Sequence, residues 1–163
     1  MVGGNPIDAS SPSISNDGRY IVFESPSDTL VANDTNFVTD IFRYDTQTGT
    51  YTRISVNSAN VQGDGYSYQP VISGNGRYVV FVSQSSNWFA GVSLGIYMRD
   101  TQTNTTTLIS RDSNGNPIDD FFLILYDISA DGRYVVFTSD AADVVPNDTN
   151  NVTDTFLYDR QTN

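Results

Sequence analysis

The side chains that could do chemistry in this chain are oxygen donors, because the sequence contains neither histidine nor cysteine. A Ser-His-Asp or Cys-His nucleophile and a zinc site of the usual kind therefore cannot be built from these residues. Paired carboxylates alone can hydrolyse glycosides, but nothing marks two of the 19 acidic residues as such a pair. We therefore predict that the chain is not an enzyme.

Two loops repeat one pattern of acidic and amide side chains. Each loop has Asp, Asn and Asp with the same spacing, namely Asp34, Asn36 and Asp40, and Asp148, Asn150 and Asp154. Such oxygen donors suit Ca²⁺, so these six residues are the candidate metal ligands. No glycine or terminal glutamate follows as in an EF-hand, and Asx turns that cap a loop are the alternative. The corresponding segment 90–95 lacks the pattern, so the sequence predicts either two calcium sites or two structural turns.

A third loop carries the adjacent aromatic residues Trp88 and Phe89, and Trp88 is the single tryptophan of the chain. Exposed aromatic side chains on a loop often contact sugars or protein partners. These two residues are therefore the candidate binding site for a glycan or protein ligand. Packing between neighbouring structural units is the alternative.

The elements that position these loops come from a repeated motif. Asn-Asp-Gly-Arg-Tyr-Ile-Val-Phe at 16–23 returns in closely similar form at 75–81 and 131–137, and its arginines are 58 and 56 residues apart. A fixed period of this size indicates one supersecondary unit in three copies, whose stacking buries a shared core. We expect the repeated arginines to pair with nearby Asp or to cover apolar surface with their stems, since chemistry seldom needs one residue per unit. These arginines are Arg19, Arg77 and Arg133.

Each copy is predicted to form an antiparallel sheet, and no segment has a sustained helical period. The first strands span 12–15, 70–73 and 126–129, the second 19–24, 77–82 and 133–138, the third 40–44, 95–99 and 155–158, and the fourth 50–55 and 105–110. Asp-Gly or Asn-Gly at the first turn allows the positive φ of a tight hairpin. The continuous apolar centre of each second strand suits a strand covered on both faces. Tandem four-stranded units of this kind are typical of β-propeller blades, with a sandwich or solenoid as the alternative.

The motif resembles the TolB-type, WD-like β-propeller repeat, written roughly as Ser-x-Asp-Gly-x-x-(Ile/Val)-(Ala/Val)-Phe-x-Ser. The matching positions are Ser15, Asp17, Gly18, Val22, Phe23 and Ser25; Ser73, Gly76, Val80, Phe81 and Ser83; and Ser129, Asp131, Gly132, Val136, Phe137 and Ser139. The resemblance covers nearly the whole chain and implies a propeller fold. It implies little about function, because members of the family range from periplasmic scaffolds to peptidase gating domains and extracellular repeat proteins.

We therefore expect an all-β chain of three propeller blades forming one segment, residues 1–163, with repeats at about 9–66, 67–122 and 123–163. The last repeat stops where its outer strand should begin, because Asn163 corresponds to Asn104. Propellers usually have about four to eight blades. The three-blade arc is thus expected to close by oligomerisation or with further repeats, or to receive a strand from another chain.

Charge and hydropathy limit the partners. A net charge of −11 repels phosphate backbones and anionic lipid, so nucleic acid and membrane surfaces are not expected partners. The longest apolar run, 121–126, is far shorter than the ~20 residues that span a bilayer. The polar composition, rich in Thr and Asn, favours an extracytoplasmic location, whether secreted, cell-surface or periplasmic, although the first residues show no signal peptide.

These observations favour a non-catalytic structural or interaction module, a partial propeller that assembles with itself or with neighbouring repeats. Two other functions remain open. One is a carbohydrate- or ligand-binding, lectin-like propeller that uses Trp88 and Phe89. The other is the non-catalytic propeller domain of a larger hydrolase. No cofactor is expected apart from the candidate Ca²⁺.

Overall fold

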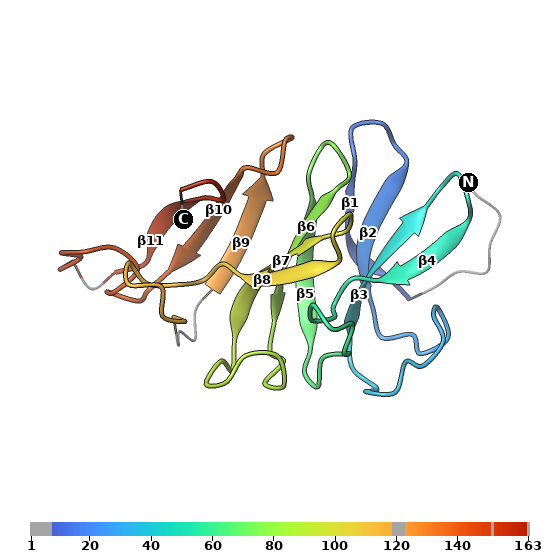
Figure 1. Cartoon of the computed structure of the whole chain (residues 1–163), viewed down its shortest axis with the longest axis horizontal. Coiled ribbons are helices and arrows are strands. Elements are labelled where there is room, and N and C mark those ends of the chain that lie inside the picture. The colour runs from blue at the N-terminus through green and yellow to red at the C-terminus, as the bar shows by residue number, and fades with distance from the viewer. Residues whose placement is uncertain (1–7, 119–122, 151, 163) are drawn as a thin grey trace.

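The three repeats fold as three antiparallel sheets that stand side by side (Figure 1). The computed structural model describes residues 8–118, 123–150 and 152–162. Blade one consists of β1 (Ser10–Ile14), β2 (Tyr20–Ser25), β3 (Asp40–Asp45) and β4 (Thr50–Arg53). Blade two consists of β5 (Ser67–Ile72), β6 (Tyr78–Ser83), β7 (Gly95–Asp100) and β8 (Thr105–Leu108). Blade three consists of β9 (Leu123–Ile128), β10 (Tyr134–Ser139) and β11 (Asp154–Asp159).

Strand order within each sheet follows the order along the chain, and the predicted all-β blade architecture is confirmed. Blades one and two have four strands, whereas blade three has three. Strand β11 is thus an edge strand within the described part of the chain, as the repeat count predicted. None of the described residues form a helix that is long and apolar enough to cross a bilayer.

A short turn with a positive-φ residue joins the first strand of each blade to the second. Gly18, Gly76 and Gly132 have φ values of 69°, 73° and 75° in the turns that lead into β2, β6 and β10. A side chain is disfavoured at such angles, which explains the glycine in all three copies. The turns before the fourth strands also contain a left-handed residue, Gly49 with a φ of 70° and Asn104 with a φ of 58°.

The apolar core lies between blades rather than within them. One cluster joins blade one to blade two and includes Val22, Ile41, Ile54, Ile72, Val79, Phe81, Tyr97 and Leu108. A second cluster joins blade two to blade three and includes Val80, Val82, Ile96, Met98, Ile109, Ile128, Val135 and Phe137. All six residues of β6 are buried, so this strand is covered on both faces as predicted. In β2 and β10 some residues that face away from blade two, such as Ile21 and Val136, are only half-buried, although Phe23 and Thr138 on the same faces are buried.

The repeated arginines tie the second strand of each blade to the turn after the third. Their guanidinium groups bind carboxylates in three equivalent ion pairs: Arg19–Asp45 at 2.9 Å, Arg77–Asp100 at 2.6 Å and Arg133–Asp159 at 2.8 Å. Each guanidinium also lies over the ring of the tyrosine that follows it. The prediction that these arginines pair with Asp and cover apolar surface is confirmed.

Candidate functional site

The first predicted metal loop surrounds an arginine. The Nη1 atom of Arg53 lies 3.8 Å from Oδ1 of Asp34 and 3.9 Å from Oδ2 of Asp40. Its Nη2 atom donates a hydrogen bond to the carbonyl oxygen of Asn33 at 3.1 Å. Asn36 donates to Oδ2 of Asp40 at 3.0 Å, so the loop and β3 are joined beside the guanidinium. The positive charge between the two carboxylates in blade one is therefore supplied by β4.

Asp40 is buried at the start of β3 and is held by hydrogen bonds from two further side chains. Ser55 donates to its Oδ1 atom and also accepts the backbone N–H of Ile41 at 3.1 Å. Burial raises the pKa of the Asp40 carboxyl, while hydrogen bonds from Ser55 and Asn36 and the charge of Arg53 act in the opposite direction. The site can thus hold a buried charged carboxylate because it also holds a cation and several donors.

The equivalent loop of blade three keeps the side-chain hydrogen bond between its asparagine and the aspartate at the start of the third strand. Asn150 donates from its side chain to Oδ2 of Asp154 at 2.8 Å, and its backbone N–H donates to Oδ1 of Asp148 at 3.3 Å. Asn147 has a φ of 64°, close to the 62° of Asn33 in blade one. Among the described residues β11 pairs only with β10, so no strand takes the place of β4 and no residue corresponds to Arg53.

Metal binding by these loops stays a prediction. No group of three or more His, Cys, Asp or Glu side chains suited to a metal ion gathers in residues 8–118, 123–150 or 152–162. Sequence reasoning missed Arg53 and Ser55 as members of the first site. Comparison of the repeats could have found them, because blade two replaces Arg53 with Leu108 and keeps Ser55 as Ser110.

Trp88 and Phe89 are half-buried against the core between blades one and two. The Trp88 ring meets the rings of Phe81 and Tyr97 edge-on, at centroid distances of 6.2 and 5.1 Å, and its indole N–H donates to the carbonyl oxygen of Val61 at 3.2 Å. The Phe89 ring lies 5.8 Å from that of Tyr97. The two candidate binding residues therefore lie together, and a role in ligand binding stays a prediction.

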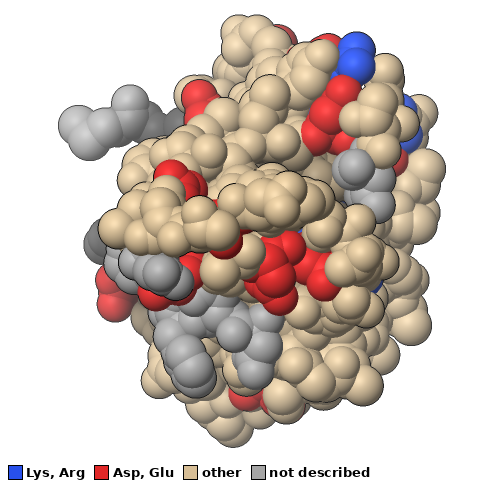
Figure 2. Space-filling model, turned by 90° about the vertical axis from the view of Figure 1, so that its left-hand side faces the viewer, with Lys and Arg blue, Asp and Glu red and all other residues tan. Residues whose placement is uncertain are grey.

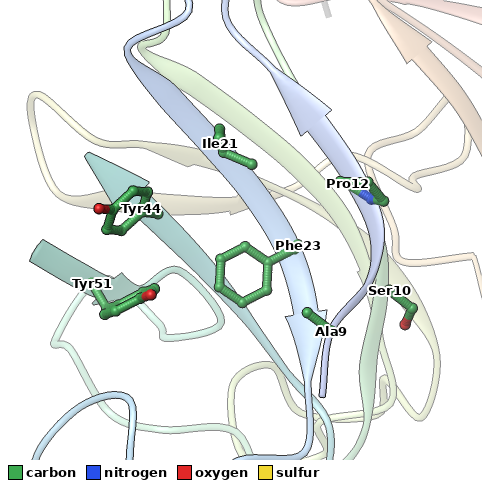
Figure 3. A pocket seen from close by; sticks show the side chains of 7 residues that line it. All are labelled: Ala9, Ser10, Pro12, Ile21, Phe23, Tyr44 and Tyr51. Carbon is green, nitrogen blue, oxygen red and sulfur yellow. The ribbon is translucent and has the colours of Figure 1, made fainter. Parts of the chain in front are cut away.

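The outward face of blade one has an apolar pocket of about 270 Å³. Figure 3 shows its lining, made by Ala9 just before β1 and by strand residues of β1, β2, β3 and β4, namely Ser10, Pro12, Ile21, Phe23, Tyr44 and Tyr51. Aromatic rings build its floor, with the centroids of Tyr44 and Tyr51 4.8 Å apart. This pocket lies on the face that, in blade two, is covered by the preceding blade. Sequence reasoning did not single it out, because its members look like ordinary strand residues.

Solved structures with the same arrangement are β-propellers. No protein-family model and no curated protein matches the chain. TolB from Acinetobacter baumannii is similar with a TM-score of 0.58 and 22% identity, over 96% of this chain and 31% of that one. A putative TolB from Agrobacterium tumefaciens gives 0.57 and 20%, over 96% and 47%. The β-propeller domain of the Trilobed protease from Pyrococcus furiosus, described as having an open velcro topology, gives 0.55 and 15%, over 93% and 41%.

The chain spans less than half the length of each of these matched structures. Identities of this size show a shared fold, which agrees with the propeller blades that the repeat motif predicted. The chain therefore consists of three blades of the β-propeller type, arranged as an open arc with two uncovered end faces and one open strand edge among its described residues.

Proposed function

We propose that the chain is a non-catalytic assembly module that joins further blades of the same type through the two end faces of its arc. The main support is that the two end faces expose residues whose counterparts are buried where two blades meet. Ile14 of β1 is 57% exposed, whereas Ile72 at the same place in blade two is 5% exposed. Leu157 of β11 is 65% exposed, whereas its counterpart Met98 is 4% exposed. Burying such apolar surface stabilises an interface by about 25 cal/mol per Å².

The contacts inside the arc indicate how a further blade would seat. The tyrosine that begins the second strand of one blade packs on the turn glycine of the next blade. A Cβ atom added to Gly76 would lie 2.6 Å from the Tyr20 ring, and one added to Gly132 would lie 2.0 Å from the Tyr78 ring. Gly18 has nothing within 4 Å of that position. The turn of blade one is therefore free to pack against a tyrosine of a further blade. Tyr134, which begins β10, is the tyrosine that a blade three would bring to this contact.

Backbone hydrogen bonds between adjacent turns repeat along the arc. The N–H of Asn16 donates to the carbonyl of Gly74, and the N–H of Asn75 donates to the carbonyl of Ala130, both at 2.9 Å. The two donors differ by one position in the repeat, since Asn75 corresponds to Asp17, but both bonds join adjacent turns beside the same tyrosine contact. We expect the same turn-to-turn contact where blade three meets a blade one of another copy or of a neighbouring repeat.

Light scattering coupled to size exclusion tests the proposal in its self-association form. We expect a mass above that of the 17.9 kDa chain at micromolar concentration. Leu157→Asp should shift the mass toward the monomer, because a carboxylate would be buried without a partner at the contact. Ala59→Asp, which adds the same charge to an exposed loop, is the control and should leave the mass unchanged. A folded wild-type monomer at these concentrations would contradict self-association.

Two further aspects of the proposal follow from composition and from the matched structures. We place the module outside the cytoplasm, where a polar composition rich in Thr and Asn is common.

A second candidate function is that of the non-catalytic propeller domain of a larger hydrolase, because one matched structure is the propeller domain of a protease. Sequencing the gene beyond these residues tests this candidate, which requires a catalytic domain in the same reading frame.

A further inference from the structure

We propose that the groove between blades one and two binds the acidic group of a small ligand, a carboxylate or a phosphate, through the guanidinium of Arg43. The groove has a volume of about 260 Å³, and its lining includes Tyr20 and Arg43 of blade one and Asn75, Arg77 and Gln102 of blade two. Both of these blades have four strands, so the groove lies inside the arc and uses neither end face. The proposal therefore does not depend on association between copies.

The first step of the argument is that Arg43 carries a charge without a partner. It lies half-buried in β3 and pairs in register with Val22, on the face that packs against blade two. Among the described residues its contact is with the ring of Tyr20, whose centroid lies 4.5 Å from Cζ, and it makes no hydrogen bond or ion pair. The carboxylate of Asp45 is already bound by Arg19 at 2.9 Å. Burial lowers the pKa of the Arg43 guanidinium, and a bound anion would oppose this effect.

The second step is that blade packing does not need this free arginine. In the groove between blades two and three, Met98 stands in the place of Arg43, since each pairs with the valine two residues after the tyrosine that begins the second strand. The cation over that tyrosine, Tyr78, is Arg160, with its Cζ 4.4 Å from the ring centroid. Arg160 donates from Nε to the carbonyl oxygen of Gly132 at 3.1 Å. The free guanidinium is thus particular to the groove between blades one and two.

The third step is that further donors line the same groove. Arg77 uses Nε and Nη2 to bind Asp100, at 2.9 and 2.6 Å. Its Nη1 atom and the side-chain amide of Gln102 have no hydrogen-bond partner among the described residues. Because Asp100 balances the charge of Arg77, the unbalanced positive charge of the groove is that of Arg43. A planar guanidinium with neighbouring N–H donors suits an oxyanion, which accepts two parallel hydrogen bonds from it.

The charge of the whole chain indicates which kind of anion fits. The net charge is −11, so the long-range field repels anions. Figure 2, which faces the blade-three end, shows acidic side chains across the middle of that surface and basic ones mainly near its upper right edge. An anion must therefore be recognised at short range, by hydrogen bonds within the groove. This favours a small ligand with one acidic group over a polyanion such as nucleic acid.

NMR titration of the arginine side chains tests the proposal. Sodium acetate and sodium phosphate are added separately to the labelled chain, with sodium chloride replaced so that ionic strength stays constant. We expect the Nε–H signal of Arg43, identified by its loss in Arg43→Met, to shift and saturate with at least one of the two anions. Saturation with acetate alone identifies a carboxylate, and saturation with phosphate alone identifies a phosphate group. Shifts that stay linear and match those in chloride, for both anions, would overturn the proposal.

Two variants separate this site from a general effect of charge. Arg43→Met, which copies the residue of blade two, should weaken the affinity for the anion at least tenfold, the effect of losing a charged hydrogen bond. Its binding is followed through the backbone N–H signals of residues 101 and 102, and Arg43→Gln replaces it if thermal melting shows that it does not fold. Arg160→Met, the matched control, removes the cation of the neighbouring groove and should leave the affinity unchanged. Equal losses in both variants would contradict the proposal.

The mass in solution keeps this inference apart from the assembly proposal. Saturable anion binding by a chain that scattering shows to be monomeric would support the site and contradict self-association. An oligomer whose Arg43 signal does not respond to either anion would contradict the site alone.

Discussion

At the scale of single residues, the most unusual group in the core is the hydroxyl of Tyr97. This side chain is fully buried and stacks on Phe81, yet its hydroxyl has no hydrogen-bond partner among the described residues. Burial raises the pKa of the phenol to about 12, so the group stays neutral. The same position is Phe42 in blade one and Phe156 in blade three. The fold thus tolerates an apolar ring at this place in two of its three blades.

Replacing this hydroxyl is expected to do no harm. Tyr97→Phe should leave the free energy of unfolding unchanged or raise it by about 1 kcal/mol, because a buried unpaired donor is removed. Tyr97→Ala is the matched comparison and should cost about 3–5 kcal/mol through the cavity it leaves. Urea unfolding of the three proteins measures both effects. A loss of more than 1 kcal/mol in the phenylalanine variant would show that the hydroxyl has a partner, such as an ordered water.

At the scale of elements, glycine in the tight turns meets two separate requirements, a positive φ and close packing against the neighbouring blade. Gly132 needs positive φ, and the ring of Tyr78 also occupies the space where its side chain would be. Gly18 has the same backbone conformation but an empty surrounding. The pair therefore separates the cost of backbone conformation from the cost of blade packing.

Alanine at these two turns should have unequal effects. Gly18→Ala is expected to cost about 1 kcal/mol from the left-handed backbone alone. Gly132→Ala should cost clearly more, because the methyl group would also displace Tyr78. The effect on association between copies should be the reverse. Gly18→Ala should weaken association, because its methyl group would lie where the tyrosine of a further blade is expected to pack. Chemical denaturation of dilute protein gives the first comparison and the mass in solution gives the second. Equal destabilisation by the two substitutions would contradict the packing argument.

The strands were predictable from the sequence because each depends on its own residues and its immediate turn. Asp17-Gly18 and the run Tyr20–Phe23 favour a hairpin strand, and each of the eleven strands in the described residues lies within a few residues of its predicted place. The site around Arg53 was not predictable from any one repeat. Its partners Asp34 and Asp40 come from a different loop and strand, and only the three-dimensional pairing of β3 with β4 brings them together.

At the scale of the whole molecule, each blade contains the same ion pair between its repeated arginine and the aspartate that ends its third strand. Hydrogen bonds from Arg19 and Arg133 lower the pKa values of Asp45 and Asp159 from 3.8 to about 2, and Arg77 lowers that of Asp100 as well. A carboxylate with a lowered pKa in the folded state stabilises it above the unfolded value, and this contribution is lost as pH falls toward the folded value. All three blades should therefore weaken together in acid.

The stability of the chain should thus fall as pH decreases from about 4 to about 2. Arg77→Gln, which removes the partner of Asp100, should have a lower melting temperature than wild type at pH 7. Its melting temperature should also decrease less when the pH is lowered. The two melting curves should approach each other near the lower end of this range. Melting temperatures measured across these pH values provide the test, and a constant difference between the two proteins would exclude the proposed role of the pair.

The two uncovered faces of the arc also have a geometric consequence. They are different surfaces, since one presents the pocket of Ile21 and Phe23 and the other presents Leu157. Contact between copies would therefore be heterologous and head-to-tail, not the isologous contact of a two-fold dimer. A heterologous contact ends growth only if its rotation closes a ring, and otherwise it continues as a helical filament. The tilt between adjacent blades would thus decide whether the module makes a particle of fixed size or a fibre.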